Sequence, residues 1–187
     1  MKESTDILQK TTDFVDQSFG GKQKEHFERT VYWLEQFSPV FSEAHAVAAY
    51  AHDIERAFRD PSIPEPDDYL AISFLRDHEE AGAKIMADFL REQGQSEEFI
   101  QTVRHLISRH EEGGDAEQDA LKDADSVSFF ETNAEIFVTK KAPEEGYAKV
   151  KRKLDWMYNR ISNPEAQAVA KENYQHWSAE LEKRFAD

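Results

Sequence analysis

His52 and Asp53 stand side by side at the end of an alanine-rich run from Ala48 to Ala51. Imidazole and carboxylate are both side-chain groups that bind metal ions in proteins. The small side chains before the pair give a flat face that packs closely, so we expect the stretch to be buried and His52 to turn inward towards a small partner such as a metal ion. In a chain with 38 acidic residues a His-Asp pair also arises by chance, so its meaning depends on the other histidines.

Helical phase separates the seven histidines of the chain into those that face the core and those that face solvent. His78 shares an apolar stripe with Ile85, and His110 shares one with Ile107, whereas His26 lies at the edge of an apolar face. Phase leaves His45 ambiguous and places two further histidines on polar faces, His105 and His176. The histidines at or near core-facing positions are therefore His26, His52, His78 and His110.

Four inward histidines from four different segments are difficult to bury as isolated groups, because each needs a hydrogen-bond partner of its own. Any single one is more simply a core histidine with a satisfied ring, but a shared metal centre accommodates all four together. A further acidic ligand is then expected, and the segment 121–130 offers Asp123 and Asp125. These two positions point about 200° apart on a helix, so only one of them faces the site, and phase alone does not choose between them.

Helices must position these residues, because no stretch keeps the strict alternation of a strand. The capping residues, glycines and prolines predict helices over residues 4–20, 24–37, 42–59, 78–92, 96–113, 116–141, 143–161 and from 164 to near the end, with a short helical piece at 69–75. The expected fold is all-α, with about seven to eight helices in one domain over residues 1–187. The proline-rich segment 60–68 is the one clear loop, and its position makes a lid over the site conceivable.

The composition excludes several classes of protein. The chain has no cysteine, so disulfides, thiolate zinc sites and a cysteine nucleophile are ruled out. A formal net charge of −15 argues against binding to nucleic acid or to an anionic membrane. We find no signal-like or membrane-spanning stretch and expect a soluble cytoplasmic protein, a monomer or a homodimer. An acidic protein that acts on an anionic substrate must gather positive charge locally, in metal ions or in clustered arginines and lysines.

The order of these residues resembles the HD-domain superfamily of metal-dependent phosphohydrolases. The contexts that carry the resemblance are HFERTV around His26, AAYAHDIER around the His-Asp doublet, DHEEAGAKIM around His78, LISRHEEG around His110 and LKDADSVSF around Asp125. The family's last ligand is the Asp of an Ala-Asp pair, which selects Asp125 over Asp123. The resemblance covers about residues 22–130, and residues 131–187 carry no part of the motif, so we interpret them as helices packed on the core.

The resemblance implies which residues bind metal. His26, His52, Asp53 and Asp125 would hold a first ion, and the presence of His78 and His110 resembles variants that hold two, with Asp53 as the bridging, catalytic carboxylate. A set dominated by imidazoles suits Fe or Mn, with Co, Ni or Zn as alternatives, better than Mg or Ca. Two such ions generate hydroxide near neutral pH and clamp a phosphate oxygen.

For the phosphate of the substrate we expect Arg29 and Arg56, which lie one turn after His26 and one turn after His52. The alternative for each is a surface ion pair with a neighbouring acid. A basic run further along could also rim the site, but we interpret it as a solvated helix face: Lys149, Lys151, Arg152 and Lys153.

These features predict a metal-dependent phosphohydrolase that acts on a nucleotide or another small phosphate ester. Arg56 stands where deoxynucleotidases of the superfamily have a catalytic Glu and the cyclic-dinucleotide branch has Lys, and Glu55-Arg56 is not the Glu-Asp pair of the guanosine-tetraphosphate hydrolases. The resemblance therefore implies a general small-phosphate hydrolase. Two other hypotheses stay open, a di-iron oxygenase with the same ligand set and a helical module that binds metal without catalysis.

Overall fold

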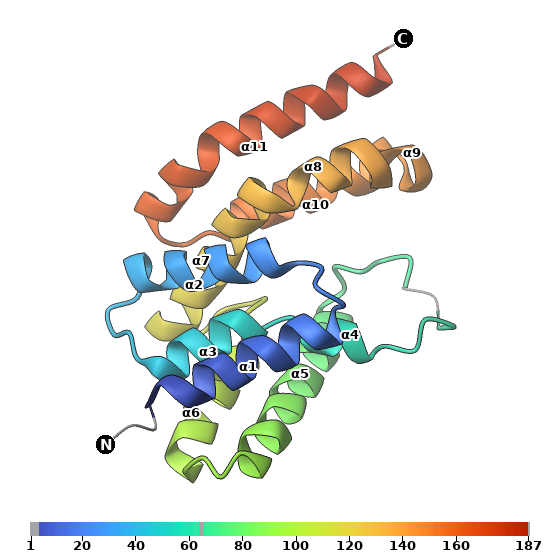
Figure 1. Ribbon diagram of the computed structural model, residues 1–187. Coiled ribbons are helices and arrows are strands. Elements are labelled where there is room, and N and C mark those ends of the chain that lie inside the picture. The colour runs from blue at the N-terminus through green and yellow to red at the C-terminus, as the bar shows by residue number, and fades with distance from the viewer. Residues whose placement is uncertain (1–3, 64–65, 187) are drawn as a thin grey trace.

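The structure is a computed structural model that describes residues 4–63 and 66–186, and within these residues it contains helices and no strand. This confirms the all-α prediction (Figure 1). None of the described helices has the length and apolar character needed to span a membrane. The helices are α1 (Ser4–Ser18), α2 (Lys24–Phe37), α3 (Glu43–Ala51), α4 (Glu55–Phe58), α5 (Ile72–Glu92), α6 (Glu97–Ile107), α7 (Ala116–Thr132), α8 (Ala134–Ile136), the π-helix η1 (Phe137–Lys141), α9 (Ala142–Glu145), α10 (Tyr147–Asn159) and α11 (Pro164–Phe185).

Several helix starts follow the predicted capping residues. The side chain of Ser96 accepts a hydrogen bond from the backbone of the first turn of α6. Asp115 forms a capping box with Gln118 at the start of α7, so two otherwise unpaired backbone N–H groups are satisfied. Asn163 accepts from the backbone N–H of Glu165 at the start of α11, and a proline occupies the first turn of that helix.

The predicted helix over residues 42–59 is wrong at its most important point. α3 ends at Ala51, and residues 52–54 form a turn before the single turn of α4. Nδ1 of His52 donates a hydrogen bond to the backbone carbonyl of Ala49 at 2.7 Å. The backbone N–H of Ile54 then bonds to the carbonyl of Ala51, three residues earlier, instead of four. The chain therefore tightens and turns at the doublet, which lets His52 and Asp53 point to different neighbours.

Other predicted boundaries are also corrected. α5 begins at Ile72 and absorbs most of the short piece predicted at 69–75. The predicted helix 116–141 is interrupted after Thr132, where Asn133 leads into α8 and the π-helix η1. Gly146, with φ of 90°, separates α9 from α10 within the predicted helix 143–161. The proline-rich loop lies partly outside the described residues, so its role as a lid stays a prediction.

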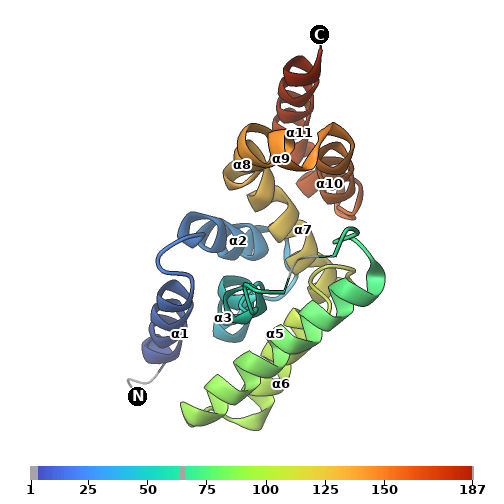
Figure 2. The ribbon, with the colours of Figure 1, turned by 90° about the vertical axis from the view of Figure 1, so that its right-hand side faces the viewer.

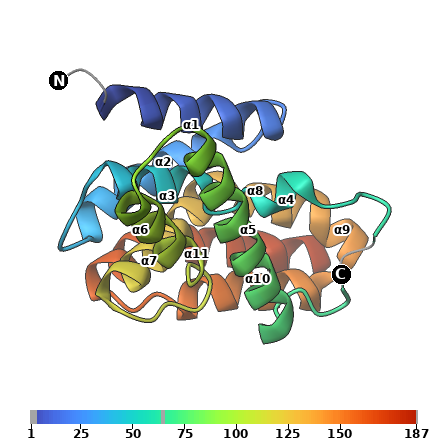
Figure 3. The same ribbon diagram turned by 90° about the horizontal axis from the view of Figure 1, so that it is seen from below.

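Two hydrophobic clusters share the helix α7. The first is built on α1, α2, α3, α5 and α6 and includes Phe27 and Met86, and the second joins the end of α7 to α10 and α11 and includes Phe130 and Leu154. Figure 2 shows α7 passing between the two groups of helices, and every side chain from Ala120 to Phe130 is buried. Viewed from below, α1 lies along one side and α5 runs across the front (Figure 3). A polar residue in the middle of α7 therefore lies between two apolar cores.

Candidate metal centre

The first group of possible metal ligands gathers around Asp125 in the middle of α7. His26 comes from α2 and His52 from the turn after α3. Their Nε2 atoms lie 3.2 and 3.4 Å from Oδ1 of Asp125. All three residues are buried, and their ligand atoms lie within 4.8 Å of one another, the spacing that a single ion can draw together.

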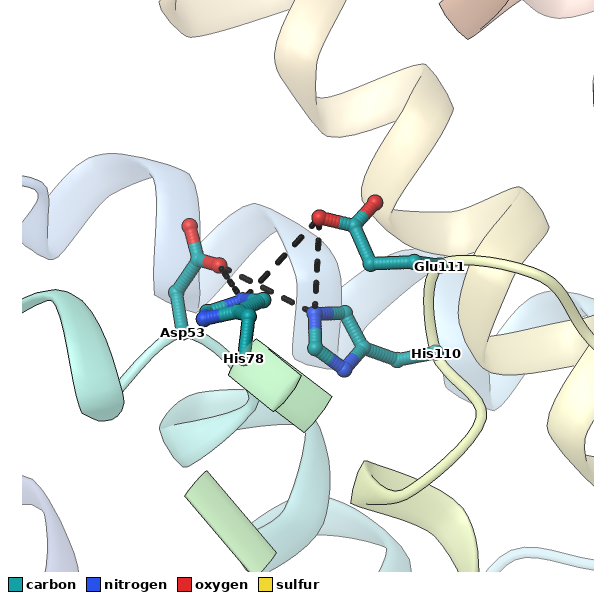
Figure 4. Close-up of side chains that lie close together, drawn as sticks. All are labelled: Asp53, His78, His110 and Glu111. Atoms are coloured by element: carbon teal, nitrogen blue, oxygen red, sulfur yellow. Dashed lines mark hydrogen bonds and ion pairs between the residues drawn. The ribbon is translucent and has the colours of Figure 1, made fainter. Parts of the chain in front are cut away.

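The second group is drawn in Figure 4 and consists of Asp53, His78, His110 and Glu111. His78 projects from α5, and the last two residues lie in the turn that follows α6. Oδ1 of Asp53 lies 3.0 Å from Nε2 of His78 and 3.8 Å from Nε2 of His110. A carboxylate oxygen of Glu111 lies 4.0 and 3.9 Å from the same two nitrogens. The four ligand atoms thus surround one position.

The two groups adjoin each other through the histidine rings. The ring of His52 lies 5.4 Å from that of His26 and 5.2 Å from that of His110, measured between centroids. The ring of His78 lies 5.2 Å from that of His110. The predicted inward histidines are thus brought together, all four of them, with Asp53 and Asp125 among them.

The ring nitrogens on the far side of the histidines are already occupied. Nδ1 of His52 and Nδ1 of His110 each lie 2.7 Å from a backbone carbonyl, that of Ala49 and that of Ile107. Because a carbonyl only accepts, both Nδ1 atoms carry a proton, and in the neutral ring this leaves the lone pair on Nε2. His26 follows the same pattern, with Nδ1 2.8 Å from the hydroxyl oxygen of Ser128. This is the arrangement in which an outer partner fixes a metal-binding imidazole.

Two of these inward nitrogens have no hydrogen bond. Nε2 of His52 and Nε2 of His110 are buried and without a hydrogen-bond partner among the described residues. A buried acceptor left unpaired costs free energy, and a metal ion at each group removes that cost. The donor set therefore fits a transition-metal ion better than it fits a closed protein core.

The carboxylates of the site are ionised at neutral pH, as metal ligands must be. Burial by itself raises the pKa of Asp53, but Arg56 and the neighbouring histidines together outweigh it and hold the pKa well below the usual range. Burial likewise raises the pKa of Asp125 and of Glu111, but Arg160 and the neighbouring histidines together lower both, that of Glu111 to about 2. The centre thus presents three carboxylate charges between two arginines.

His78 differs from the other three histidines because it lies between two carboxylates. Its Nδ1 is 2.6 Å from Glu55 and its Nε2 is 3.0 Å from Asp53. Burial and Arg56 lower the pKa of His78, but these two hydrogen bonds raise it above its ordinary value overall. A metal ion at this group would therefore displace a proton from Nε2, while Glu55 would keep its hold on Nδ1.

The two aspartates that phase could not separate have different tasks. Asp125 is a member of the first group of possible metal ligands, as the resemblance selected. Asp123 accepts hydrogen bonds from the backbone N–H groups of Ser162 and Asn163, at 2.9 and 2.7 Å, and so holds the chain at the start of α11. His45 is buried but its ring is fully paired, with Ser42 on one side and Glu117 on the other.

The two predicted phosphate-binding arginines do not share a location. Arg56 lines a cavity of about 230 Å³ beside the metal groups, together with Asp53 and Asp125. Arg29 is not among the residues that line this cavity, because its guanidinium forms a two-pronged ion pair with Glu131, at 2.7 and 3.0 Å. The structure thus brings Arg56 to the site and leaves Arg29 in the surface ion pair that was its alternative.

Residues 3–183 match the family model described as a domain of unknown function, DUF4202. The chain belongs to this family. No curated protein and no solved structure matches the chain.

The site in this member of the DUF4202 family includes residues that sequence reasoning missed. Arg160, from the segment 131–187 that we interpreted as packing alone, donates to Glu111 at 2.5 Å and also to Asp125. Lys153 was assigned to a solvated face, but its side chain is only 8% exposed and it lines the cavity. That interpretation is therefore wrong for these two residues, because α10 brings them against the centre.

A usable sequence signal existed for only some of these residues. Lys153 is in phase with Val150 and Met157 on the apolar stripe of α10, so periodicity alone marks it as inward. Glu111 lies beyond the last residue of α6, in a turn where helical phase no longer applies. Arg160 reaches its partners across 35 and 49 positions of the chain, which no local pattern reveals.

Proposed function

We propose that this protein is a metal-dependent phosphohydrolase that acts on a nucleotide or another small phosphate ester in the cytoplasm. The observation that carries the proposal is that the buried Nε2 atoms of His52 and His110 face carboxylates without forming a hydrogen bond, while the other nitrogen of each ring is fixed by a carbonyl. Fe or Mn is the proposed metal, since imidazoles make up the larger part of the donor set.

Two ions would be held by separate groups of residues. His26, His52 and Asp125 would hold one, and Asp53, His78, His110 and Glu111 would hold the other. When bound, such ions lower the pKa of water towards neutrality and polarise a phosphoryl oxygen.

The protein's own residues orient the site. Arg56 donates from Nε to Asp53 at 2.8 Å and from its terminal nitrogen to Glu111 at 3.3 Å, so it sets the directions of two carboxylates of one metal group. Arg160 does the same for Glu111 and Asp125, which belong to different groups. The two arginines thus fix the positions of carboxylates from both groups, and Arg56 also lines the cavity.

The shape of the cavity favours a small substrate. Its volume of about 230 Å³ lies below the range of about 300 to 1,000 Å³ that is typical of sites for drug-sized ligands. Its lining combines the apolar side chains of Phe129, Phe137 and Met157 with Arg56 and with carboxylates of both ligand groups. A phosphate ester with a compact organic group matches these dimensions better than a dinucleotide does.

The proposal is tested by elemental analysis of the full-length protein purified without added metal, alongside a panel of small phosphate esters and nucleotides. The expected result is bound Fe or Mn, phosphate release from a member of the panel, and loss of both in Asp53→Ala. His105→Ala is the matched control, since this exposed histidine pairs only with residues outside the centre.

The outcomes separate the competing functions. Bound metal with oxygen consumption and no phosphate release would replace hydrolysis by oxygenase chemistry. Bound metal with neither activity would leave a metal-binding helical module. Absence of metal after purification and after reconstitution would overturn the metal centre itself.

A further inference from the structure

Lys153 is a buried cation without a close anionic partner. It projects from α10 with only 8% of its surface exposed, and among the described residues its ammonium contacts aromatic rings and forms no hydrogen bond or ion pair. Its ammonium lies over the ring of Trp156 at 4.7 Å and near that of Phe129 at 5.8 Å. Burying a charge that contacts only aromatic rings costs free energy, because no hydrogen-bond acceptor replaces the lost water.

The carboxylates nearby are already committed to other groups. Glu111 and Asp125 attract Lys153 through space, but Arg160 lies between them and hydrogen-bonds to both. These two acids are also members of the metal groups. The charge of Lys153 therefore remains available for something that enters the cavity from outside.

Two further cations line the same space. Arg56 and Lys141 border the cavity together with Lys153, and all three also line a smaller recess that continues from it beside Tyr69 and Phe137. Lys141 has one ion pair, with Glu145 at 3.8 Å, and lies over the ring of Phe137. The cavity is lined by these three cations and by the three carboxylates of Asp53, Glu111 and Asp125, so in a chain with a net charge of −15 the acidic charge is balanced at this place.

We propose that Lys153, Arg56 and Lys141 form an anion subsite that binds the phosphate group of a small phosphate monoester, with Lys153 as its central donor. Arg56 comes from α4, Lys141 from η1 and Lys153 from α10, and none of the three is a possible metal ligand. This inference deepens the proposed function and rests on it for the identity of the ester. Lysine supplies a compact point charge and Arg56 a planar fork, and both are suited to phosphate oxygens.

The experiment measures the binding of inorganic phosphate to the full-length protein as purified, with the metal content of each preparation determined in parallel. Trp156 lies against Lys153 and provides a fluorescence reporter at the subsite. The variant Lys153→Met keeps an unbranched, flexible side chain one atom shorter and removes its charge. Lys171→Met removes one charge from an exposed position of α11 and is the matched control. Lys141→Met is a second variant, at a partly exposed position.

At equal metal content, we expect Lys153→Met to bind phosphate at least tenfold more weakly than the wild type. Lys141→Met should lose less affinity than Lys153→Met, and the phosphate affinity of Lys171→Met should equal that of the wild type. Equal phosphate affinity in wild type and in both cavity variants overturns the subsite. Loss of metal from Lys153→Met also overturns it, because the residue would then act on the metal groups. Phosphate binding that depends on Lys153 without hydrolysis of any ester supports the subsite and rejects the proposed function alone.

Discussion

The guanidinium of Arg160 donates a hydrogen bond to the carboxylate of Asp125 across 35 positions of the chain. The same guanidinium donates to Glu111 at 2.5 Å, and the ring of Trp156 covers its face at 4.4 Å. Asp125 belongs to one group of possible metal ligands and Glu111 to the other. One buried arginine from the C-terminal helices therefore fixes the spacing between the two groups.

Replacing this arginine by an uncharged side chain of similar length leaves two buried carboxylates without their main partner. We expect Arg160→Met to lower the free energy of unfolding by about 3 to 5 kcal/mol in the presence of a chelator, as is typical when one member of a buried ion pair is removed. Urea unfolding followed by circular dichroism measures the change.

Arg152→Met is the matched control for this prediction. Arg152 pairs with Asp68, and both side chains are about half exposed, so its loss should cost about 0 to 1 kcal/mol. A cost for Arg160→Met that does not exceed the cost for Arg152→Met would show that the buried pair does not stabilise the fold.

The separation of the ligands into two groups predicts that each ion is lost separately. His26→Ala removes a ligand of one group and His110→Ala a ligand of the other. Each variant should retain roughly half of the metal of the wild type, because a site that loses one imidazole binds its ion much more weakly. Elemental analysis gives the ratio, and complete loss of metal from both variants would instead indicate that the groups fill only together.

The sequence was most informative where side chains repeat with the helical period. His26, His78 and His110 were placed inward from phase, and in the structure all three are buried. The choice of Asp125 over Asp123 came from the family resemblance, and the structure shows the physical difference. The side chain of Asp125 contacts histidines, whereas that of Asp123 accepts hydrogen bonds from backbone N–H groups later in the chain.

Phase failed where the backbone leaves the regular helix. The helical phase predicts that the doublet His52-Asp53 lies within a continuous helix. In the structure the ring of His52 is hydrogen-bonded to a backbone carbonyl, and the chain turns there. The turn after α6 carries Glu111 for the same reason. Arg160 was missed because its ion pairs join segments far apart in the chain, and the pairing depends on how α10 docks against α7.

The start of α7 provides a prediction about stability and pH. Asp115 accepts hydrogen bonds from two backbone N–H groups, and the bond from Gln118 is the main reason that its pKa lies below the ordinary value of 3.8. Asp115→Ala should lower the free energy of unfolding by about 1 kcal/mol, while Asp115→Asn should lose less because its amide oxygen still caps.

Because the pKa of Asp115 is lower in the folded state, its ionised form stabilises the fold above the unfolded pKa. This contribution is lost as the pH falls below about 4 and through the folded pKa. The difference in urea stability between wild type and Asp115→Asn should therefore shrink over that range. His105→Ala keeps the cap and removes the other side-chain partner of Asp115, so it should not reproduce the effect of the lost cap.

The last prediction concerns Glu55, which holds the outer nitrogen of His78. The carboxylate lies 2.6 Å from Nδ1, and Arg59 braces it at 2.7 Å. Removing an outer partner of this kind typically weakens metal binding by about 10- to 100-fold, because the ring loses its orientation and its basicity. Glu55→Ala should show a loss of this size, while Glu55→Gln should lose less because the amide oxygen still accepts.

A matched control is available elsewhere in the chain. Glu117 lies 3.0 Å from Nε2 of His45, a histidine outside both metal groups, so Glu117→Ala removes a comparable contact without touching the centre. Competition with a chromogenic chelator measures the affinity of each variant. Equal affinities in Glu55→Ala and Glu117→Ala would mean that His78 does not bind the metal through a fixed ring. A loss confined to Glu55→Ala would support the assignment of His78 to the second group, because Glu55 contacts the centre through that ring.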